Sequence, residues 1–334
     1  MRTITSGWLL VTGLLLAGTA RAIASDFSPT AEPGLPAGWS LVHLPGSRPE
    51  VTLQVLKRPA LAPPTRYSVV VLPGSGCTGW LPVAPRYFAG LLHAELLVLH
   101  KPGANLSAGL GADCSDAFVQ SDSLSAWRDH VRSALQAHYA GLQASAAVAP
   151  PLPVLLVGIS EGAELLPYVA PDVPGLAALV MVAAPGLDPR ETGALQARRT
   201  GQWQAWQALE HAQASLASDD LVLEGRTLRY WRDFWRWRLA QPLRQVPWLL
   251  LRVWGDADEL VPIEAYQRFL LVSSNRAAPF CDARLTNADH ALQSELMAST
   301  DPNRQQRDGL RWLWARLEAW ARKPSAGFCE QMRQ

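Results

Sequence analysis

A serine stands between two glycines directly after an apolar run. Val154–Val157 reads as a buried strand, and Gly158, Ser160 and Gly162 follow it. A serine hydroxyl is a weak nucleophile at neutral pH, so it needs a neighbouring base and a site for the oxyanion. Flanking glycines let a strand and a helix approach closely around a sharp turn, which exposes the serine and points the next N–H, that of Glu161, at the oxyanion. An ordinary glycine-rich turn is the alternative, but the helix-like EGAELLPYV that follows favours a nucleophile elbow.

A cluster of carboxylates follows a later apolar run. In VWGDADELVP, a G-x-x-D-x-x-V-P pattern runs from Gly255 to Pro262. With this pattern and the serine turn, the chain resembles the α/β-hydrolase superfamily. The resemblance implies that Asp258 is the acid of a Ser-His-Asp triad, where it would hold the imidazole in the useful tautomer and stabilise its charged form. Asp256 and Glu259 lie close enough in sequence to be alternatives.

A histidine completes the order nucleophile, acid, base that this fold uses. His290 follows a short strand-like run in ARLTNADHALQSE, and similar hydrolases often carry an Asp-His pair in this loop. The other histidines lie on predicted helices, early in the chain, or at the end of a strand: His130, His138, His211, His43, His93 and His100. A lone histidine is more often structural than catalytic, but His290 arrives at the expected step. We therefore predict that it is the general base.

The loop in VVLPGSGCTGW, after an early predicted strand, is the candidate for the second oxyanion donor. Aligned with the H-G-x-G loop of similar esterases, it carries Pro73 in place of the histidine. The backbone N–H of Ser75 or Gly76 would join that of Glu161, and the departure at Pro73 leaves the donor open between the two. The alternative is a tight turn shaped by Cys77 alone.

Residues 1–24 are predicted to form a secretory signal peptide. Arg2 precedes an apolar run over Trp8–Ala17, and cleavage after Ala22 or Ala24 fits the small residues that follow. The run falls short of the about 20 apolar residues of a spanning helix, so an uncleaved anchor is the less favoured alternative. We expect no integral membrane segment after cleavage, and a periplasmic or secreted protein.

Export would place the four cysteines in an oxidising compartment. An even number in an oxidising compartment predicts disulfides, and four cysteines allow 3 connectivities. We favour Cys77–Cys114 and Cys281–Cys329, because each pair joins a predicted strand end to a loop or tail. Free buried thiols are the alternative. No Cys-x-x-Cys or clustered-histidine spacing predicts a metal site.

Short apolar runs closed by Gly or Pro recur along the chain, as is typical of strands buried on both faces of a parallel sheet. They begin at Val51, Tyr67, Ala94, Val154, Leu176 and Pro247. Helical stretches such as 123–142 lie between them. The alternation predicts an α/β fold with a doubly wound, mostly parallel sheet. We expect a loose Pro/Gly-rich lead-in over 25–50 and a hydrolase core over 51–186 and 247–334.

Residues 187–246 interrupt this alternation. They are rich in Gln, Arg, Trp and Ala and contain two helix-like stretches. An insertion of this length between two sheet strands usually lies over the strand ends, so we predict a helical cap inserted before the acid-bearing strand. Its aromatic residues either line a substrate pocket or only pack the cap onto the core: Trp231, Phe234, Trp235 and Trp237.

The net charge of +1 disfavours a nucleic-acid binder, which would usually show a basic patch. The motifs predict a serine hydrolase that forms an acyl-enzyme, needs neither metal nor organic cofactor, and cleaves a carboxyl ester. Its substrate would be a small acyl compound with an apolar or aromatic part. A peptidase or amidase is the alternative within the same chemistry. A non-catalytic binding protein that kept the fold is the alternative from a different class.

Overall fold

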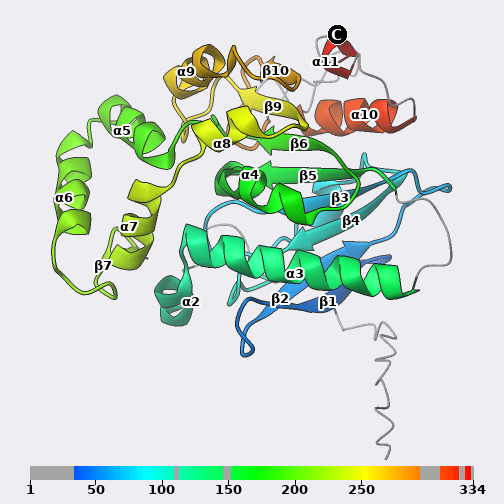
Figure 1. Cartoon of the computed structure of the whole chain (residues 1–334), viewed down its shortest axis with the longest axis horizontal. Coiled ribbons are helices and arrows are strands. Elements are labelled where there is room, and N and C mark those ends of the chain that lie inside the picture. Colours follow the sequence, from blue (N-terminus) through cyan, green and yellow to red (C-terminus); the bar gives the residue numbers. More distant parts are fainter. Residues whose placement is uncertain (1–33, 109–112, 146–151, 294–308, 323–327, 332–334) are drawn as a thin grey trace, which may run out of the picture.

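The computed structural model describes residues 34–108, 113–145, 152–293, 309–322 and 328–331 (Figure 1). The predicted signal peptide, 1–24, lies outside the described residues. None of the helices within these ranges is long and apolar enough to cross a membrane.

Eight strands of the described residues form one sheet (Figure 1). Their order is β1 (Ser40–Pro45), β2 (Thr52–Arg58), β4 (Ala94–Leu99), β3 (Tyr67–Leu72), β5 (Val154–Ile159), β6 (Leu176–Val182), β9 (Leu249–Gly255) and β10 (Phe280–Leu285). The pairs β1–β2 and β2–β4 are antiparallel, and every other pair is parallel. The predicted mostly parallel sheet is therefore confirmed.

Helices cover both faces of the sheet. They are α1 (Ala84–Tyr87), α3 (Leu124–Ser145), α4 (Leu166–Val169), α9 (Ile263–Ser273), α10 (Gly309–Arg322) and α11 (Phe328–Gln331). The short helix α2 (Asp116–Ser121) precedes α3. In β3, Val70 and Leu72 pack in the layer of α3, α4 and α9, whereas Val69 and Val71 pack in the layer of α1 and α10. Because successive strand residues face opposite sides and both sides are covered, the strand reads as a continuous apolar run.

The lead-in that we expected to be loose contains a strand. β1 pairs antiparallel with β2 in a register that runs from Ser40 opposite Lys57 to Pro45 opposite Thr52. Apolar side chains at Leu41, Val42 and Leu44 pack against the core on either side of the sheet. The prolines and glycines around this short edge strand hide it in the sequence.

The 187–246 segment is mainly helical, and most of it stands beside the sheet (Figure 1). They are α5 (Pro189–Arg199), α6 (Trp203–Ala214), β7 (Val222–Leu223), β8 (Arg226–Thr227), α7 (Leu228–Arg236) and α8 (Ala240–Gln245). Trp206 and Trp235 stack with ring centroids 4.5 Å apart, and Trp237 lies 4.7 Å from the ring of Tyr168 in α4. Trp206 and Trp235 thus pack within the segment, and Trp237 packs onto the core, while the choice between our two alternatives stays a prediction.

A carboxylate of this segment also holds the start of α3. Asp233 of α7 accepts a hydrogen bond from the backbone N–H of Ser125 at 2.6 Å. The hydroxyl of Ser123 accepts another from the N–H of Ala126 at 3.2 Å. The first N–H groups of a helix have no partner within the helix, so both contacts stabilise its end.

Candidate active site

The turn after β5 has the backbone of a nucleophile elbow. Ser160 has a φ of +51°, a left-handed conformation that costs a non-glycine residue about 1–3 kcal/mol. A Cβ added at Gly158 would lie 2.4 Å from Cα of Ala163, and one added at Gly162 would lie 2.1 Å from the carbonyl oxygen of Leu72. Only glycine fits at either position. The helix expected after the turn begins as the 3₁₀ helix η1 (Ser160–Leu165) and continues as α4.

The structure brings Ser160, His290 and Asp258 together. Nε2 of His290 lies 3.1 Å from the serine Oγ, and Nδ1 lies 2.8 Å from Oδ2 of Asp258. The three residues follow β5, β10 and β9, whose carboxyl ends meet at one edge because these strands are parallel. With its proton on Nδ1, the imidazole donates to the carboxylate and presents the lone pair of Nε2 to the hydroxyl.

The carboxylate of Asp258 is buried, with 2% of the residue exposed. Its Oδ1 accepts hydrogen bonds from the N–H groups of Leu260 at 2.8 Å and Val261 at 2.9 Å. The hydroxyl of Tyr266, which the sequence analysis did not single out, lies 3.2 Å from Oδ2. Burial, reinforced by the carboxylate, raises the pKa of Tyr266, so the phenol stays protonated and donates. These three hydrogen bonds hold the carboxylate in place beside the imidazole.

The two alternative acids face elsewhere. Oδ2 of Asp256 lies 2.8 Å from Nη2 of Arg284, in an ion pair on the outer side of the loop. Glu259 is exposed, and its backbone oxygen accepts a hydrogen bond from the side chain of Gln196 at 2.9 Å. Of the three candidate carboxylates, only that of Asp258 contacts His290.

Other histidines hold the backbone. Nε2 of His100 accepts a hydrogen bond from the N–H of Trp80 at 3.1 Å, and Nδ1 donates to the carbonyl of Gln54 at 3.2 Å. Burial lowers the pKa of His100 to about 4, so the ring is neutral at physiological pH. Nδ1 of His130 accepts from the N–H of Ser47 at 3.1 Å.

The loop after β3 lies against Ser160. A Cβ added at Gly74 would stand 3.2 Å from Cβ of Ser160, so the residues that follow, Ser75 and Gly76, begin beside the serine side chain. Gly76 has a φ of +96°, which turns the chain sharply at this point. The position suits an oxyanion donor, and the choice between the two N–H groups stays a prediction.

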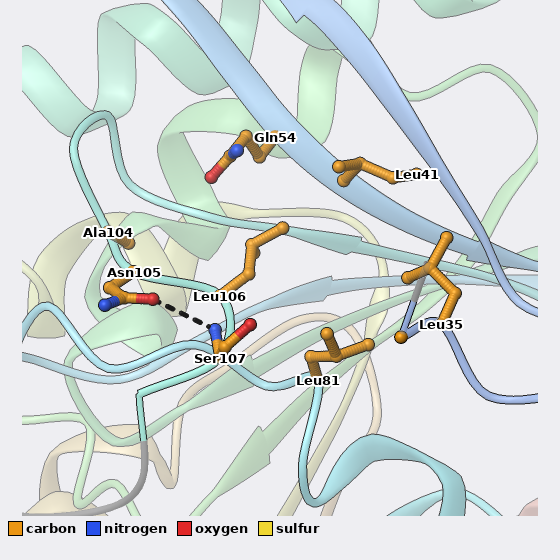
Figure 2. A pocket seen from close by; sticks show the side chains of 9 residues that line it. Leu35, Leu41, Gln54, Leu81, Ala104, Asn105, Leu106 and Ser107 are labelled. Carbon is orange, nitrogen blue, oxygen red and sulfur yellow. Dashed lines mark hydrogen bonds between the residues drawn. The ribbon is translucent and has the colours of Figure 1, made fainter. Parts of the chain in front are cut away.

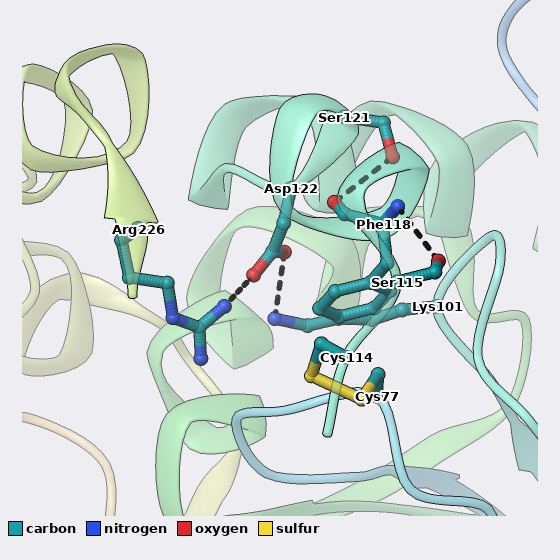
Figure 3. Close-up of a disulfide and its surroundings, with 8 residues drawn as sticks. All are labelled: Cys77, Lys101, Cys114, Ser115, Phe118, Ser121, Asp122 and Arg226. Atoms are coloured by element: carbon teal, nitrogen blue, oxygen red, sulfur yellow. Dashed lines mark hydrogen bonds and ion pairs between the residues drawn. A yellow bond between two sulfur atoms is a disulfide. The ribbon is translucent and has the colours of Figure 1, made fainter. Parts of the chain in front are cut away.

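Two disulfides join distant parts of the fold. Cys77 is bonded to Cys114, with the Cα atoms 5.5 Å apart, and links the loop after β3 to the start of α2 (Figure 3). Cys281 in β10 is bonded to Cys329 in α11, with the Cα atoms 5.0 Å apart. These are the pairs that the sequence analysis favoured.

A pocket of about 380 Å³ adjoins the loop after β3 (Figure 2). Leucine side chains form much of its wall, and its lining includes Leu35, Leu41, Gln54, Leu81, Asn105 and Leu106. Asn105 donates its N–H to the carbonyl of Cys77 at 2.9 Å, which ties the pocket wall to the loop. None of the three triad side chains lines this pocket.

A buried charge cluster that the sequence analysis missed surrounds Glu161. Nζ of Lys101 lies 2.9 Å from Oδ1 of Asp122 and also contacts Oε1 of Glu161. The hydroxyl of Tyr230 in α7 donates to Oε2 of Glu161 at 2.6 Å, and Arg226 in β8 pairs with Asp122 (Figure 3). The members are far apart in sequence. The only local signal was a lysine placed directly after a strand.

Solved structures with the same fold cover most of the chain. The esterase domain of a Rhodothermus marinus protein is 19% identical and covers 85% of this chain and 98% of its own, with a TM-score of 0.51. Est1E from Butyrivibrio proteoclasticus is 12% identical, covers 88% of this chain and 99% of its own, and has a TM-score of 0.51.

An acylaminoacyl peptidase from Pyrococcus horikoshii is 12% identical, with a TM-score of 0.54; the match covers 89% of this chain and 44% of the peptidase. No protein-family model and no curated protein sequence matches the chain. These likenesses concern the three-dimensional arrangement. The chain has the α/β-hydrolase fold, which confirms at the level of the fold the resemblance drawn from its motifs.

Proposed function

We propose that this protein is a serine hydrolase that cleaves a carboxyl ester, or a related acyl bond, through an acyl-enzyme on Ser160. One observation carries the proposal: a continuous chain of hydrogen bonds runs from Ser160 through His290 to Asp258, with distances of 3.1 and 2.8 Å. The esterases that share the fold support it.

In the first half of the reaction, Oγ of Ser160 attacks the acyl carbon while its proton passes to Nε2 of His290. The carbonyl π electrons move to the oxygen, and Asp258 stabilises the imidazolium through Nδ1. The tetrahedral intermediate then collapses. The C–O bond to the alcohol breaks, His290 returns the proton to the leaving oxygen, and the acyl group stays on the serine.

In the second half, a water molecule gives its proton to Nε2 of His290 and attacks the acyl carbon. Collapse of the second tetrahedral intermediate breaks the bond to Oγ of Ser160, which recovers the proton, and the carboxylic acid leaves. In both halves the oxyanion would accept hydrogen bonds from the N–H of Glu161 and from that of Ser75 or Gly76. No metal or organic cofactor enters any of these steps.

The 187–246 segment would act as a cap over the carboxyl ends of the strands. Its contacts with the elbow support this role, because Tyr230 reaches Glu161 and Nε1 of Trp237 donates to the carbonyl of Glu164 at 3.1 Å. We expect a small acyl substrate. A preference for apolar or aromatic groups would come from cap side chains beyond those already engaged in packing.

Cleavage of a peptide or amide is the second candidate, and the fold shared with an acylaminoacyl peptidase favours keeping it. The same triad can perform it, because His290 can protonate a leaving amine as readily as an alcohol. A non-catalytic binding protein is the third candidate. The hydrogen-bonded triad speaks against it.

We also propose that residues 1–24 direct export and that the protein works in the periplasm or outside the cell. The two disulfides support an oxidising compartment. Expression of the full chain in a bacterial host, followed by N-terminal sequencing of the exported protein, should give a start at Ile23 or Ser25. Retention of Met1 in the cytoplasmic fraction would contradict export.

The test of the enzymatic function uses the chain from Ser25, a panel of p-nitrophenyl acyl esters and a fluorophosphonate probe. We expect the wild type to be labelled and to hydrolyse at least one ester, and Ser160→Ala to do neither. Ser274→Ala is the matched control, since this hydroxyl only donates to the carbonyl of Leu271 at 2.9 Å on an exposed helix end. Peptide hydrolysis without ester hydrolysis would replace the esterase by the peptidase. A folded wild type inert towards probe, esters and peptides would overturn the proposal in favour of a binding protein.

A further inference from the structure

The residue after the nucleophile carries a carboxylate that the reaction does not use. The side chain of Glu161 is 8% exposed, and side chains from two other parts of the fold contact it directly. Lys101 follows β4, Tyr230 belongs to α7, and Arg226 of β8 reaches the same cluster through Asp122 at the end of α2. Figure 3 shows Lys101 and Arg226 converging on the two oxygens of Asp122.

The cluster pairs two basic side chains with two acidic ones. Lys101 and Arg226 face Asp122 and Glu161. Burial raises the pKa of Asp122, although both cations oppose this shift. Burial alone would lower the pKa of Lys101, but the two carboxylates more than offset this and raise it. Burial opposes ionisation of Glu161 as well, yet the neighbouring cations lower its pKa. The lysine and the glutamate are therefore both charged.

Such a cluster is a poor way to stabilise a fold. Desolvation of buried charges tends to cancel their mutual attraction, so well-packed apolar residues of similar volume would often serve stability equally well. An apolar cluster would be the simpler solution in this otherwise hydrophobic core. The charged cluster lies next to Ser160, and this position suggests a role in the reaction.

Two consequences for the oxyanion follow from this position. First, the contacts of Lys101 and Tyr230 fix the side chain of Glu161, and with it the peptide whose N–H faces the developing charge. Second, an uncompensated carboxylate one residue from the nucleophile would oppose negative charge on the oxyanion, because like charges repel strongly in a low-dielectric site. The ammonium of Lys101 cancels that carboxylate.

We propose that Lys101 and Tyr230 are positioning residues of the oxyanion site, which hold Glu161 in place and neutralise its charge beside Ser160. This inference rests on the proposed function. Tyr230 and Arg226 belong to the 187–246 segment, so docking of this segment on the core completes the support of the oxyanion site. The cap would then govern kcat as well as access of the substrate.

The central test compares Lys101→Met with the double variant Lys101→Met/Glu161→Gln. The single variant leaves one excess negative charge and should lower kcat about 10- to 100-fold, with KM changed less than about threefold. The double variant removes that excess, so most of kcat should return. Lys57→Met is the matched control, because it removes a lysine whose ion pair with Glu95, at 3.2 Å, lies at the partly exposed surface away from the elbow.

A pH profile separates this role from a merely structural one. The titratable and charged groups around Glu161 are Lys101, Asp122, Arg226, Tyr230 and the buried Glu164, whose pKa is raised well above its usual value by burial and by Glu161. In Lys101→Met, protonation of Glu161 relieves the repulsion. The ratio of variant to wild-type kcat should therefore rise as the pH falls from about 9 to about 6, and this rise should vanish in the double variant.

Tyr230→Phe decides the matter if Lys101→Met does not fold, because it keeps the ring and removes one hydroxyl. We expect a fall in kcat of about 3- to 10-fold with little change in KM, and none for the control Tyr139→Phe. Any of three results would overturn the inference. The first is a wild-type kcat in folded Lys101→Met, and the second is a double variant in which kcat does not recover. The third, where the lysine variant does not fold, is a wild-type kcat in Tyr230→Phe. Absence of labelling and turnover in the wild type would instead overturn the proposed function.

Discussion

Adding one methyl group at Gly162 should break the elbow. The new Cβ would lie 2.1 Å from the carbonyl oxygen of Leu72 and 2.5 Å from that of Pro73, where real Cβ contacts are essentially never shorter than 3.0 Å. Both obstacles are backbone atoms at the end of β3 and the start of the loop that follows it. Neither can rotate away, so strand and elbow must separate by at least about 0.9 Å, which is the gap between 2.1 and 3.0 Å.

The separation has two measurable costs. Overpacking of this kind destabilises a protein by about 3 kcal/mol. A displacement of about 1 Å between a nucleophile and its supporting groups slows a reaction about 100-fold. We therefore expect Gly162→Ala to lose about 3 kcal/mol in urea unfolding followed by tryptophan fluorescence. Its labelling by the fluorophosphonate probe should slow about 100-fold relative to the wild type.

Gly141→Ala adds the same methyl group but should stabilise the fold. Gly141 lies within α3, and an added Cβ would meet nothing within 4 Å. Alanine in a helix interior should raise the free energy of unfolding by about 0.5–1 kcal/mol and leave labelling unchanged. Wild-type stability and labelling in Gly162→Ala would refute the close-packed elbow on which the site is built.

Three further outcomes are expected. Asp258→Asn should lower kcat by about 10⁴-fold in the ester assay, whereas Asp256→Asn stays within about threefold; equal effects would contradict the assignment of the acid. Replacing Cys77 and Cys114 by alanine opens a loop that spans 37 residues and should cost about 4 kcal/mol in urea unfolding, and a loss below about 1 kcal/mol would contradict it. The folded-state pKa of His100 is about 4, below the 6.5 of the unfolded chain, so its contribution of about 3 kcal/mol is present above pH 6.5 and lost as the pH falls towards 4. In His100→Gln this part of the stability curve, measured by urea unfolding between about pH 7 and pH 4.5, should be flatter than in the wild type.

Local patterns predicted much of the fold. Continuous apolar runs at Tyr67, Ala94 and Val154 are strands of the sheet because helices cover both of its faces. The order of the strands could not be read from such patterns, because β2 lies beside β4 and β3 lies beside β5. The edge strand β1 was not predicted, because its short sequence lies among prolines and glycines that are typical of loops.

The residues of the candidate site likewise include some that local patterns predicted and some that they did not. Ser160, Asp258 and His290 could be selected because each stands in a local pattern after an apolar run. Lys101 and Tyr230 could not, because a buried ion pair or hydrogen bond is recognised only by burial and by partners distant in sequence. The boundaries of the signal peptide, lead-in and cap stay predictions.

The hydrogen bond between Ser160 and His290 joins residues 130 positions apart in the chain. At the pace of translation, about 5–20 residues per second, the serine leaves the ribosome roughly 6–26 seconds before its base. Throughout that interval it is an ordinary alcohol, since His290, which follows β10, has not been made. On the proposed function, a nascent or prematurely terminated chain would carry an elbow without activity. The wide spacing of the three residues would therefore delay hydrolysis until the strands that position them have been made.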